Sequence, residues 1–98
     1  MSDLPSEDVT HVAETFHLLG DATRLGILFT LVDRGSLSVG ELAADVGIAA
    51  SGVSHHLRLL RIAAVVETER DGRFVRYRLA DDHVRALLEV ARAHSRHR

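Results

Sequence analysis

The fold is decided by one stretch, Ser38-Val39-Gly40-Glu41-Leu42-Ala43-Ala44-Asp45-Val46-Gly47-Ile48-Ala49-Ala50-Ser51-Gly52-Val53-Ser54-His55-His56-Leu57-Arg58-Leu59-Leu60-Arg61. Ser38 and Glu41 have the spacing of a capping box, in which each side chain accepts a hydrogen bond from the other residue's backbone amide. A helix is therefore expected to begin here and to end at Gly47. A second helix is expected from about Ala50 to Arg61. Two short helices joined by a tight, glycine-containing turn are typical of a helix-turn-helix.

The segment after this motif changes its hydrophobic period from that of a helix to that of a strand. Residues 65–70 and 73–79 are rich in β-branched and aromatic residues, and Asp71-Gly72 between them predicts a two-residue hairpin turn. In that register, two charged pairs face each other across the hairpin: Arg70 with Arg73, and Glu67 with Arg76.

Two helices are expected before the motif. Residues 1–8 are polar and are predicted to form a flexible tail, and a helix is expected from Val9 to Gly20. The inner face of that helix is expected to consist of Val12, Phe16 and Leu19. Asp21 is the expected N-cap of the next helix. The order of four helices, a hairpin and a last helix predicts a winged helix-turn-helix, mainly α with a β-hairpin wing, within a domain spanning residues 9–98.

The chain ends in an amphipathic stretch, residues 81–98, that is expected to be helical and holds four potential metal ligands: Asp81, His83, His94 and His97. His83 and His94 project from nearly the same face but lie roughly 16 Å apart at ~1.5 Å per residue, so one helix cannot close them around one ion. The 81/97 pair and the 83/94 pair share a midpoint near Leu88. Two antiparallel copies crossing there would join the ligands of both chains. The sequence therefore predicts a homodimer with two identical sites between its subunits.

The type and number of these ligands favour one class of metal. A carboxylate with three imidazoles suits tetrahedral Zn(II), and Co(II) fits similarly. Octahedral Ni(II) would need further ligands, for which His11 and His17 are candidates, although they are better interpreted as a solvated and a structural residue. The chain has no cysteine, so thiolate sites are excluded. Asp81 can also serve as the N-cap of its helix, unless Asp82 takes that role.

Charge is distributed unevenly along the chain. The net charge is −2, but residues 1–50 hold eight acids and two arginines, net −6, whereas residues 51–98 hold six acids and ten arginines, net +4. All basic residues are arginine, which genome composition can explain, yet arginine also suits bidentate contact with phosphate and guanine. Opposed arginines at the hairpin tip would repel each other, and a phosphate between them would relieve this. The predicted DNA contacts are Ser51, Ser54, His55, His56 and Arg58 in the helix, with Arg70 and Arg73 in the wing.

Length and composition exclude several other classes of protein. Ninety-eight residues, 46% of them hydrophobic, predict one small globular domain. No apolar run approaches the ~20 residues of a membrane span, and no signal peptide is evident, so a cytoplasmic protein without membrane contact is expected. No catalytic motif is present, and a closed four-ligand site leaves no position for a substrate. A metal-dependent hydrolase is therefore the least favoured alternative.

Taken together, these residues resemble the ArsR/SmtB family of bacterial metal-responsive repressors. The resemblance spans Val9 to His97 and is carried by four segments: residues 20–25, residues 51–61, Gly72-Arg73 and residues 77–79. The last-helix ligand spacing resembles that of the zinc- and cobalt-sensing branch. The resemblance implies a homodimer that represses its operator when metal-free and releases it when metal binds. The sequence pattern predicts that the terminal helices form the dimer, and two recognition helices in successive major grooves would need an inverted-repeat operator.

Two positions depart from the family pattern. The segment Ser38-Val39-Gly40-Glu41-Leu42 has no cysteine where other members carry a cysteine motif, so arsenic, cadmium or lead sensing at that position is not expected. His56 stands where many relatives have glutamine, which leaves open how metal binding is relayed to the recognition helix. The alternative to a sensor is a winged-helix regulator whose dimer site holds metal only for structure.

Overall fold

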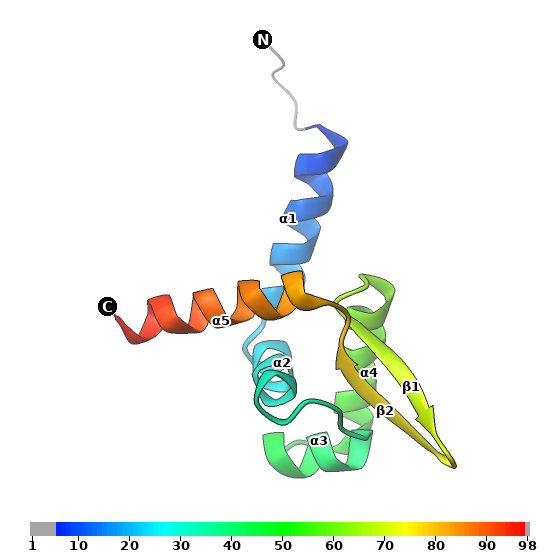
Figure 1. Ribbon diagram of the computed structural model, residues 1–98. Helices are drawn as coiled ribbons and strands as arrows, with labels where there is room; N and C mark the ends of the chain where they lie inside the picture. The colour runs from blue at the N-terminus through cyan, green and yellow to red at the C-terminus, as the bar shows by residue number, and fades with distance from the viewer. Residues whose placement is uncertain (1–5, 98) are drawn as a thin grey trace.

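The computed structural model describes residues 6–97 and has the predicted winged helix-turn-helix architecture (Figure 1). Its elements are α1 (Glu7–Leu19), α2 (Ala22–Arg34), α3 (Val39–Val46), α4 (Ala50–Ile62), β1 (Val66–Asp71), β2 (Phe74–Leu79) and α5 (Asp82–Arg96). The first helix begins two residues earlier than predicted because Ser6 accepts a hydrogen bond from the Val9 amide. Residues 1–5 of the predicted tail lie outside the described residues. None of the helices in the described part has the length and apolar character needed to cross a bilayer.

The ends of the helix-turn-helix are fixed by the local interactions that the sequence predicts. Ser38 Oγ accepts a hydrogen bond from the Glu41 amide at 3.2 Å, and Glu41 Oε1 accepts one from the Ser38 amide at 3.0 Å. Gly47 closes α3 with φ +80°, in the left-handed region that glycine enters without steric cost. Asp21 caps α2 by accepting from the Arg24 amide at 2.9 Å. These contacts confirm the predicted start of α2 and both ends of α3.

The core is built by α2, α3, α4, the hairpin and one residue of α5. The inner face of α4 is formed by Val53, Leu57 and Leu60, which are fully buried. Burial of such a side chain contributes about 1.5–3 kcal/mol. The other fully buried side chains are Ile27, Leu28, Leu31, Leu42, Val66 and Leu88. The recognition helix is therefore held in place by packing within one chain.

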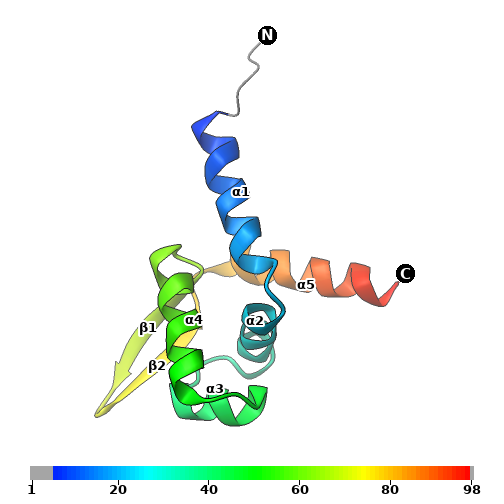
Figure 2. The same cartoon turned by 180° about the vertical axis from the view of Figure 1, so that it is seen from behind.

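The first helix contributes little to this core. Val12 and Phe16 were expected to face inward, but they are 48% and 55% exposed, and Leu19 is the only buried residue of α1. Both views show α1 projecting from the body beside α5 (Figures 1 and 2). The predicted periodicity is present, but within one chain the apolar stripe has almost nothing to cover it.

The hairpin register differs from the prediction by two residues. Arg70 pairs with Val75, Glu67 with Arg78, and Asp71 with Phe74. The two turn residues are thus Gly72 and Arg73, with φ +63° at Gly72, because a turn of this kind needs glycine at its first central position. Asp71 stays in the strand and avoids positive φ. The predicted repulsion between directly opposed arginines at the tip is therefore wrong. A shift of two residues keeps each side chain on the same face of the hairpin, because side chains alternate with a period of two.

Candidate nucleic-acid interface and metal centre

The exposed face of α4 is the first candidate site. Ser51, Ser54, His55 and Arg58 are exposed, and they lie opposite the buried face of the same helix. Figure 2 shows α4 in front, with α3 packed across its lower end and the hairpin beside it. Hydroxyls, an imidazole and a guanidinium presented on one side of a rigid helix can contact phosphates and base edges in a major groove.

His56 has a different environment from the other predicted contacts. It is half-buried, and its Nδ1 lies 3.5 Å from Arg24 Nη1 at the start of α2. The Nε of Arg24 donates to the Leu18 carbonyl at 2.7 Å. The pKa of Asp21 is lowered, chiefly because its carboxylate accepts the Arg24 amide hydrogen bond. His56 therefore links the recognition helix to the junction of α1 and α2, a contact that the sequence pattern did not indicate.

The arginines of the chain divide into paired and unpaired groups. Five make salt bridges to carboxylates: Arg34, Arg76, Arg78, Arg85 and Arg92. Six have no carboxylate within 4.0 Å among residues 6–97: Arg58 and Arg61 on α4, Arg70 and Arg73 at the hairpin tip, Arg24 in α2 and Arg96 at the end of α5. An unpaired guanidinium keeps all its donors available for phosphate. Four of these six arginines thus lie on α4 and the hairpin tip, the two elements predicted to contact DNA.

Arg76 connects the wing to the helix-turn-helix. Its Nη1 donates to the Ser36 carbonyl at 3.1 Å and approaches Glu41 Oε1 at 3.4 Å, while its Nε approaches Asp71 Oδ2 at 3.3 Å. The predicted partner, Glu67, binds Arg78 at 2.8 Å instead, because the register is shifted. The pKa of Glu41 is lowered, first by the Ser38 amide and then in part by Arg76.

The four predicted metal ligands lie at the two ends of α5. Asp81 is the N-cap, since its Oδ1 accepts from the Val84 amide at 2.9 Å, so Asp82 does not take that role. His83, His94 and His97 are exposed. No group of three or more potential ligands comes together among the described residues of this single chain. That agrees with the helix geometry, and the ligand assignment itself stays a prediction.

One side of α5 is fixed to α2. Arg92 forms a bidentate pair with Asp33 at 2.8 and 3.0 Å and lies over the Phe29 ring at 5.0 Å. Arg85 donates to the Val32 carbonyl at 3.0 Å. The pKa of Asp33 is lowered chiefly by the Arg92 hydrogen bond. These contacts set the rotation of α5, and with it the direction in which both ends of the helix present their side chains.

Several other apolar residues of α1 and α5 are exposed to solvent. Leu87 and Val90 of α5 are 37% and 68% exposed, and Phe16 of α1 is 55% exposed. A hollow of about 180 Å³ lies between the two helices and is lined by Phe16, Leu19, Gly20, Leu25, Leu87, Leu88 and Ala91. Such apolar surface on adjacent helices is typical of a protein interface.

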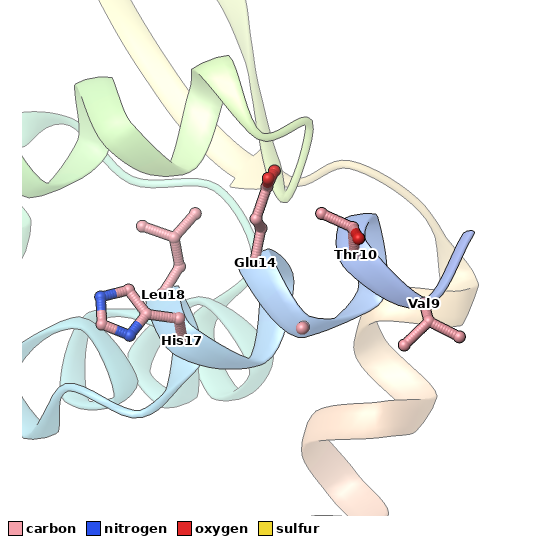
Figure 3. Close-up of a pocket in the computed structure, with 6 residues that line it drawn as sticks. Val9, Thr10, Glu14, His17 and Leu18 are labelled. Carbon is pink, nitrogen blue, oxygen red and sulfur yellow. The ribbon is translucent and has the colours of Figure 1, made fainter. Parts of the chain in front are cut away.

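A second hollow runs along α1 itself (Figure 3). It is lined by Val9, Thr10, Ala13, Glu14, His17 and Leu18, all from one helix. Figure 3 shows His17 and Leu18 together at one end of the row and Val9 at the other. His17 and His11 are both exposed, so the structural role expected for His17 is not seen within one chain.

Comparison with known proteins gives consistent similarities. Residues 21–68 match the family model described as bacterial regulatory protein, arsR family. The chain is 49% identical over 85 residues to the HTH-type transcriptional regulator KmtR of Mycobacterium tuberculosis, covering 87% of this chain and 65% of that protein. It is 36% identical over 94 residues to a cadmium resistance transcriptional regulatory protein CadC homolog of Staphylococcus aureus, covering 96% of this chain and 78% of that one.

A solved structure is similar over nearly the whole chain. It is the homodimeric winged helix-turn-helix DNA-binding domain of a possible ArsR-family transcriptional regulator from Mycobacterium bovis. The TM-score is 0.83 at 26% identity, and the match covers 97% of this chain and 90% of that one. The fold and the sequence thus point to the same class of protein.

Proposed function

Because the chain belongs to the ArsR family of bacterial regulatory proteins, we propose that it is a cytoplasmic repressor controlled by Zn(II) or Co(II). Family membership makes it a DNA-binding transcriptional regulator rather than an enzyme. In the proposal, the metal-free homodimer binds an inverted-repeat operator. Metal binding at two sites between the subunits then lowers its affinity for that operator.

One observation carries the proposal. The four potential ligands at the ends of α5 do not come together in one chain, and the apolar residues between them are exposed. Asp81 and His83 lie at one end of the helix, and His94 and His97 lie at the other. Leu87 and Val90 between them are exposed. A second copy of α5, crossing in the opposite direction, would cover the apolar residues and bring complementary ends together. A two-fold axis through this crossing would generate two identical sites.

The donor set fits the proposed metals. Three imidazoles and a carboxylate are ligands that Zn(II) takes in a four-coordinate tetrahedral site. Asp81 uses Oδ1 to cap α5, which leaves its other oxygen available. Among residues 6–97, the carboxylate of Asp81, 3.5 Å from His83, is the only one within 4.0 Å of an imidazole of His83, His94 or His97. The cap and the metal site can therefore share Asp81.

DNA binding requires the two recognition helices to be spaced correctly. In a dimer, two α4 helices would need to lie ~34 Å apart to enter successive major grooves on one face of the operator. The position of α5 sets this distance, because α5 is attached to α2 through Arg92 and α2 packs against α3 and α4. Ligands that tie α5 to its partner helix would favour one subunit arrangement over another. By linkage, metal then weakens DNA binding as much as DNA weakens metal binding.

The direct test is a titration of the full chain on DNA, with and without Zn(II). A labelled duplex, selected from random sequences by the metal-free protein, serves as the probe. Wild type is expected to bind it tightly and to lose at least about tenfold in affinity with Zn(II), a coupling of roughly 1.4 kcal/mol. His97→Ala is the matched variant and should bind DNA equally well with or without Zn(II). Equal affinities for wild type in both conditions would remove the sensing role.

Two alternatives are separated by further measurements. If the metal is only structural, a chelator will dissociate or unfold the dimer, whereas a sensor stays dimeric and binds DNA more tightly. A nickel sensor would recruit the exposed His11 or His17 as extra ligands. The absorption spectrum of the Co(II) complex distinguishes four-coordinate from six-coordinate geometry and so decides this second alternative.

A further inference from the structure

The stripe of α4 that carries Ser54 and Arg58 extends one turn further, to Arg61. These residues are spaced i, i+4 and i+7, which places them along one face of the helix. They form one wall of a groove of about 510 Å³ between α4 and the hairpin, lined by Ser54, Arg58, Arg61, Ile62 and Tyr77. Both cartoon views show α4 and the hairpin side by side (Figures 1 and 2). Neither Arg61 nor Tyr77 was indicated as a DNA contact by the sequence.

Both walls of this groove lack carboxylates. No Asp or Glu occurs in α4, from Ala50 to Ile62. On the hairpin, the register places Thr68 opposite Tyr77 and Arg70 opposite Val75, so these residues share the face that carries Tyr77, the hairpin residue of the groove. The acidic residues of β1 alternate onto the other face, where Glu67 and Glu69 bind Arg78. The groove therefore presents positive charge and hydroxyls without neighbouring negative charge.

The guanidinium of Arg61 is available to an anion from outside the chain. It is exposed, and no carboxylate of the described residues lies within 4.0 Å of it. Arg78, also exposed, instead has both Glu67 and Glu69 at 2.8 Å. Arg61 and Arg78 are thus distinguished by their salt bridges, because Arg78 is neutralised by two carboxylates and Arg61 by none of the described residues.

We infer that this groove binds the DNA backbone, with Arg61 and the Tyr77 hydroxyl donating hydrogen bonds to a phosphate. When α4 enters a major groove and the hairpin tip reaches past its edge, the strand that separates the two must cross the space between them. The inference rests on the proposed function, because the anion is a phosphate of the operator.

The experiment compares DNA affinity at several salt concentrations for the metal-free dimer, using a labelled duplex of mixed sequence. Such a duplex measures phosphate contacts without base readout. Arg61→Ala should lower the affinity several-fold and reduce the magnitude of the salt slope by about two, since each dimer loses two phosphate contacts. Tyr77→Phe should lower the affinity about twofold to fivefold without changing the slope, because only a neutral donor is lost.

Arg34→Ala is the matched control. It removes the same charge from an exposed arginine outside the groove, which ends α2 and pairs with Asp45 of α3, and it should leave the slope unchanged. A thermal melt of each variant confirms that the fold is intact. Wild-type affinity and slope for Arg61→Ala would overturn the inference and leave the proposed function standing. A wild-type chain that binds no DNA would overturn both.

Discussion

Two regions of the molecule differ in how well a single chain buries their apolar residues. One is the helix-turn-helix with its wing, and the other is the pair of terminal helices, α1 and α5. In α2, α3 and α4 the apolar faces are buried, and the capping groups of α2 and α3 are satisfied within the chain. In α1 and α5 apolar residues such as Phe16 and Val90 remain exposed. The potential ligands of α5 stay at opposite ends of one helix.

This difference indicates a division of roles between the two regions. A DNA-reading surface must keep one shape, and here a single chain supplies the packing that fixes it. A switch needs two arrangements of similar free energy. Where one chain leaves apolar residues exposed, a partner subunit and a ligand can stabilise one arrangement over the other. Substitutions confined to one region at a time test whether the two are as separate as this comparison implies.

Truncating the core of the DNA-reading half should have the largest effect. Leu57→Ala removes a fully buried side chain of α4 and should lower the free energy of unfolding by about 2–5 kcal/mol. Ile62→Ala, in the same helix at 77% exposure, should cost less than about 1 kcal/mol. Urea unfolding at one fixed protein concentration measures both values. Similar losses for the two variants would contradict the assignment of the core.

A charge placed on the terminal helices should affect assembly instead. Val90→Asp puts a carboxylate on exposed apolar surface of α5, where a partner helix would bury it. The dimer dissociation constant should rise at least about tenfold, or roughly 1.4 kcal/mol, in sedimentation equilibrium. Ala44→Asp, at an exposed position of α3, is the control and should leave the constant unchanged. An unaffected dimer in Val90→Asp would place the interface elsewhere.

Loss of the wing anchor should have a smaller effect, confined to DNA binding. Arg76→Ala breaks the contacts to Ser36 and Glu41 that hold the wing against the helix-turn-helix. Affinity for DNA should fall about fivefold, roughly 1 kcal/mol, while the salt slope stays the same because Arg76 is not expected to touch phosphate. Arg78→Ala, which loses pairing only within the hairpin, should bind nearly as wild type. A shallower slope for Arg76→Ala would make it a direct contact.

The smallest effect concerns pH. The pKa of Glu41 is lowered in the folded chain by the Ser38 amide, so its ionised form contributes stability above the unfolded pKa. That contribution is lost as pH falls below the ordinary glutamate pKa and through the lowered folded one. Glu41→Gln should therefore be less stable than wild type at neutral pH, and the difference should shrink in acid. Thermal melts between neutral and acid pH measure this.

Ser38→Ala provides the matched comparison for the pH series. It removes the hydroxyl cap, which costs about 1 kcal/mol, together with the side-chain hydrogen bond that is the second cause of the lowered Glu41 pKa, but it keeps the backbone amide that is the first cause. Its loss of stability should therefore vary less with pH than that of Glu41→Gln. A pH profile of Glu41→Gln that runs parallel to that of wild type would show that the carboxylate contributes nothing.

The sequence was sufficient where short-range interactions determine structure. The capping box at Ser38 and the left-handed Gly47 each depend on residues within one turn, and both were predicted. The buried stripe of α4 follows from its 3.6-residue period. The hairpin was placed correctly, but its register was wrong, because Asp71-Gly72 and Gly72-Arg73 are both plausible turns and only the backbone conformation separates them.

Long-range pairing was not predictable from the sequence. Nothing in the pattern shows that Arg92 binds Asp33, that Arg76 reaches Glu41, or that Arg61 lacks a partner. These outcomes depend on tertiary placement, and they decide which arginines are available for DNA. The exposure of Phe16 has a similar origin, since periodicity identifies an apolar face without saying whether its own chain or a second chain covers it.

The most direct test of the central claim mixes two variants and follows Co(II) absorption. One variant carries Asp81→Ala with His83→Ala, and the other carries His94→Ala with His97→Ala. If each site takes its two halves from different subunits, neither variant alone forms a tetrahedral Co(II) site, but a mixed dimer contains one intact site. Random exchange of subunits should then restore about a quarter of the wild-type tetrahedral absorbance. No recovery on mixing, or a full tetrahedral spectrum from either variant alone, would contradict a site shared between subunits.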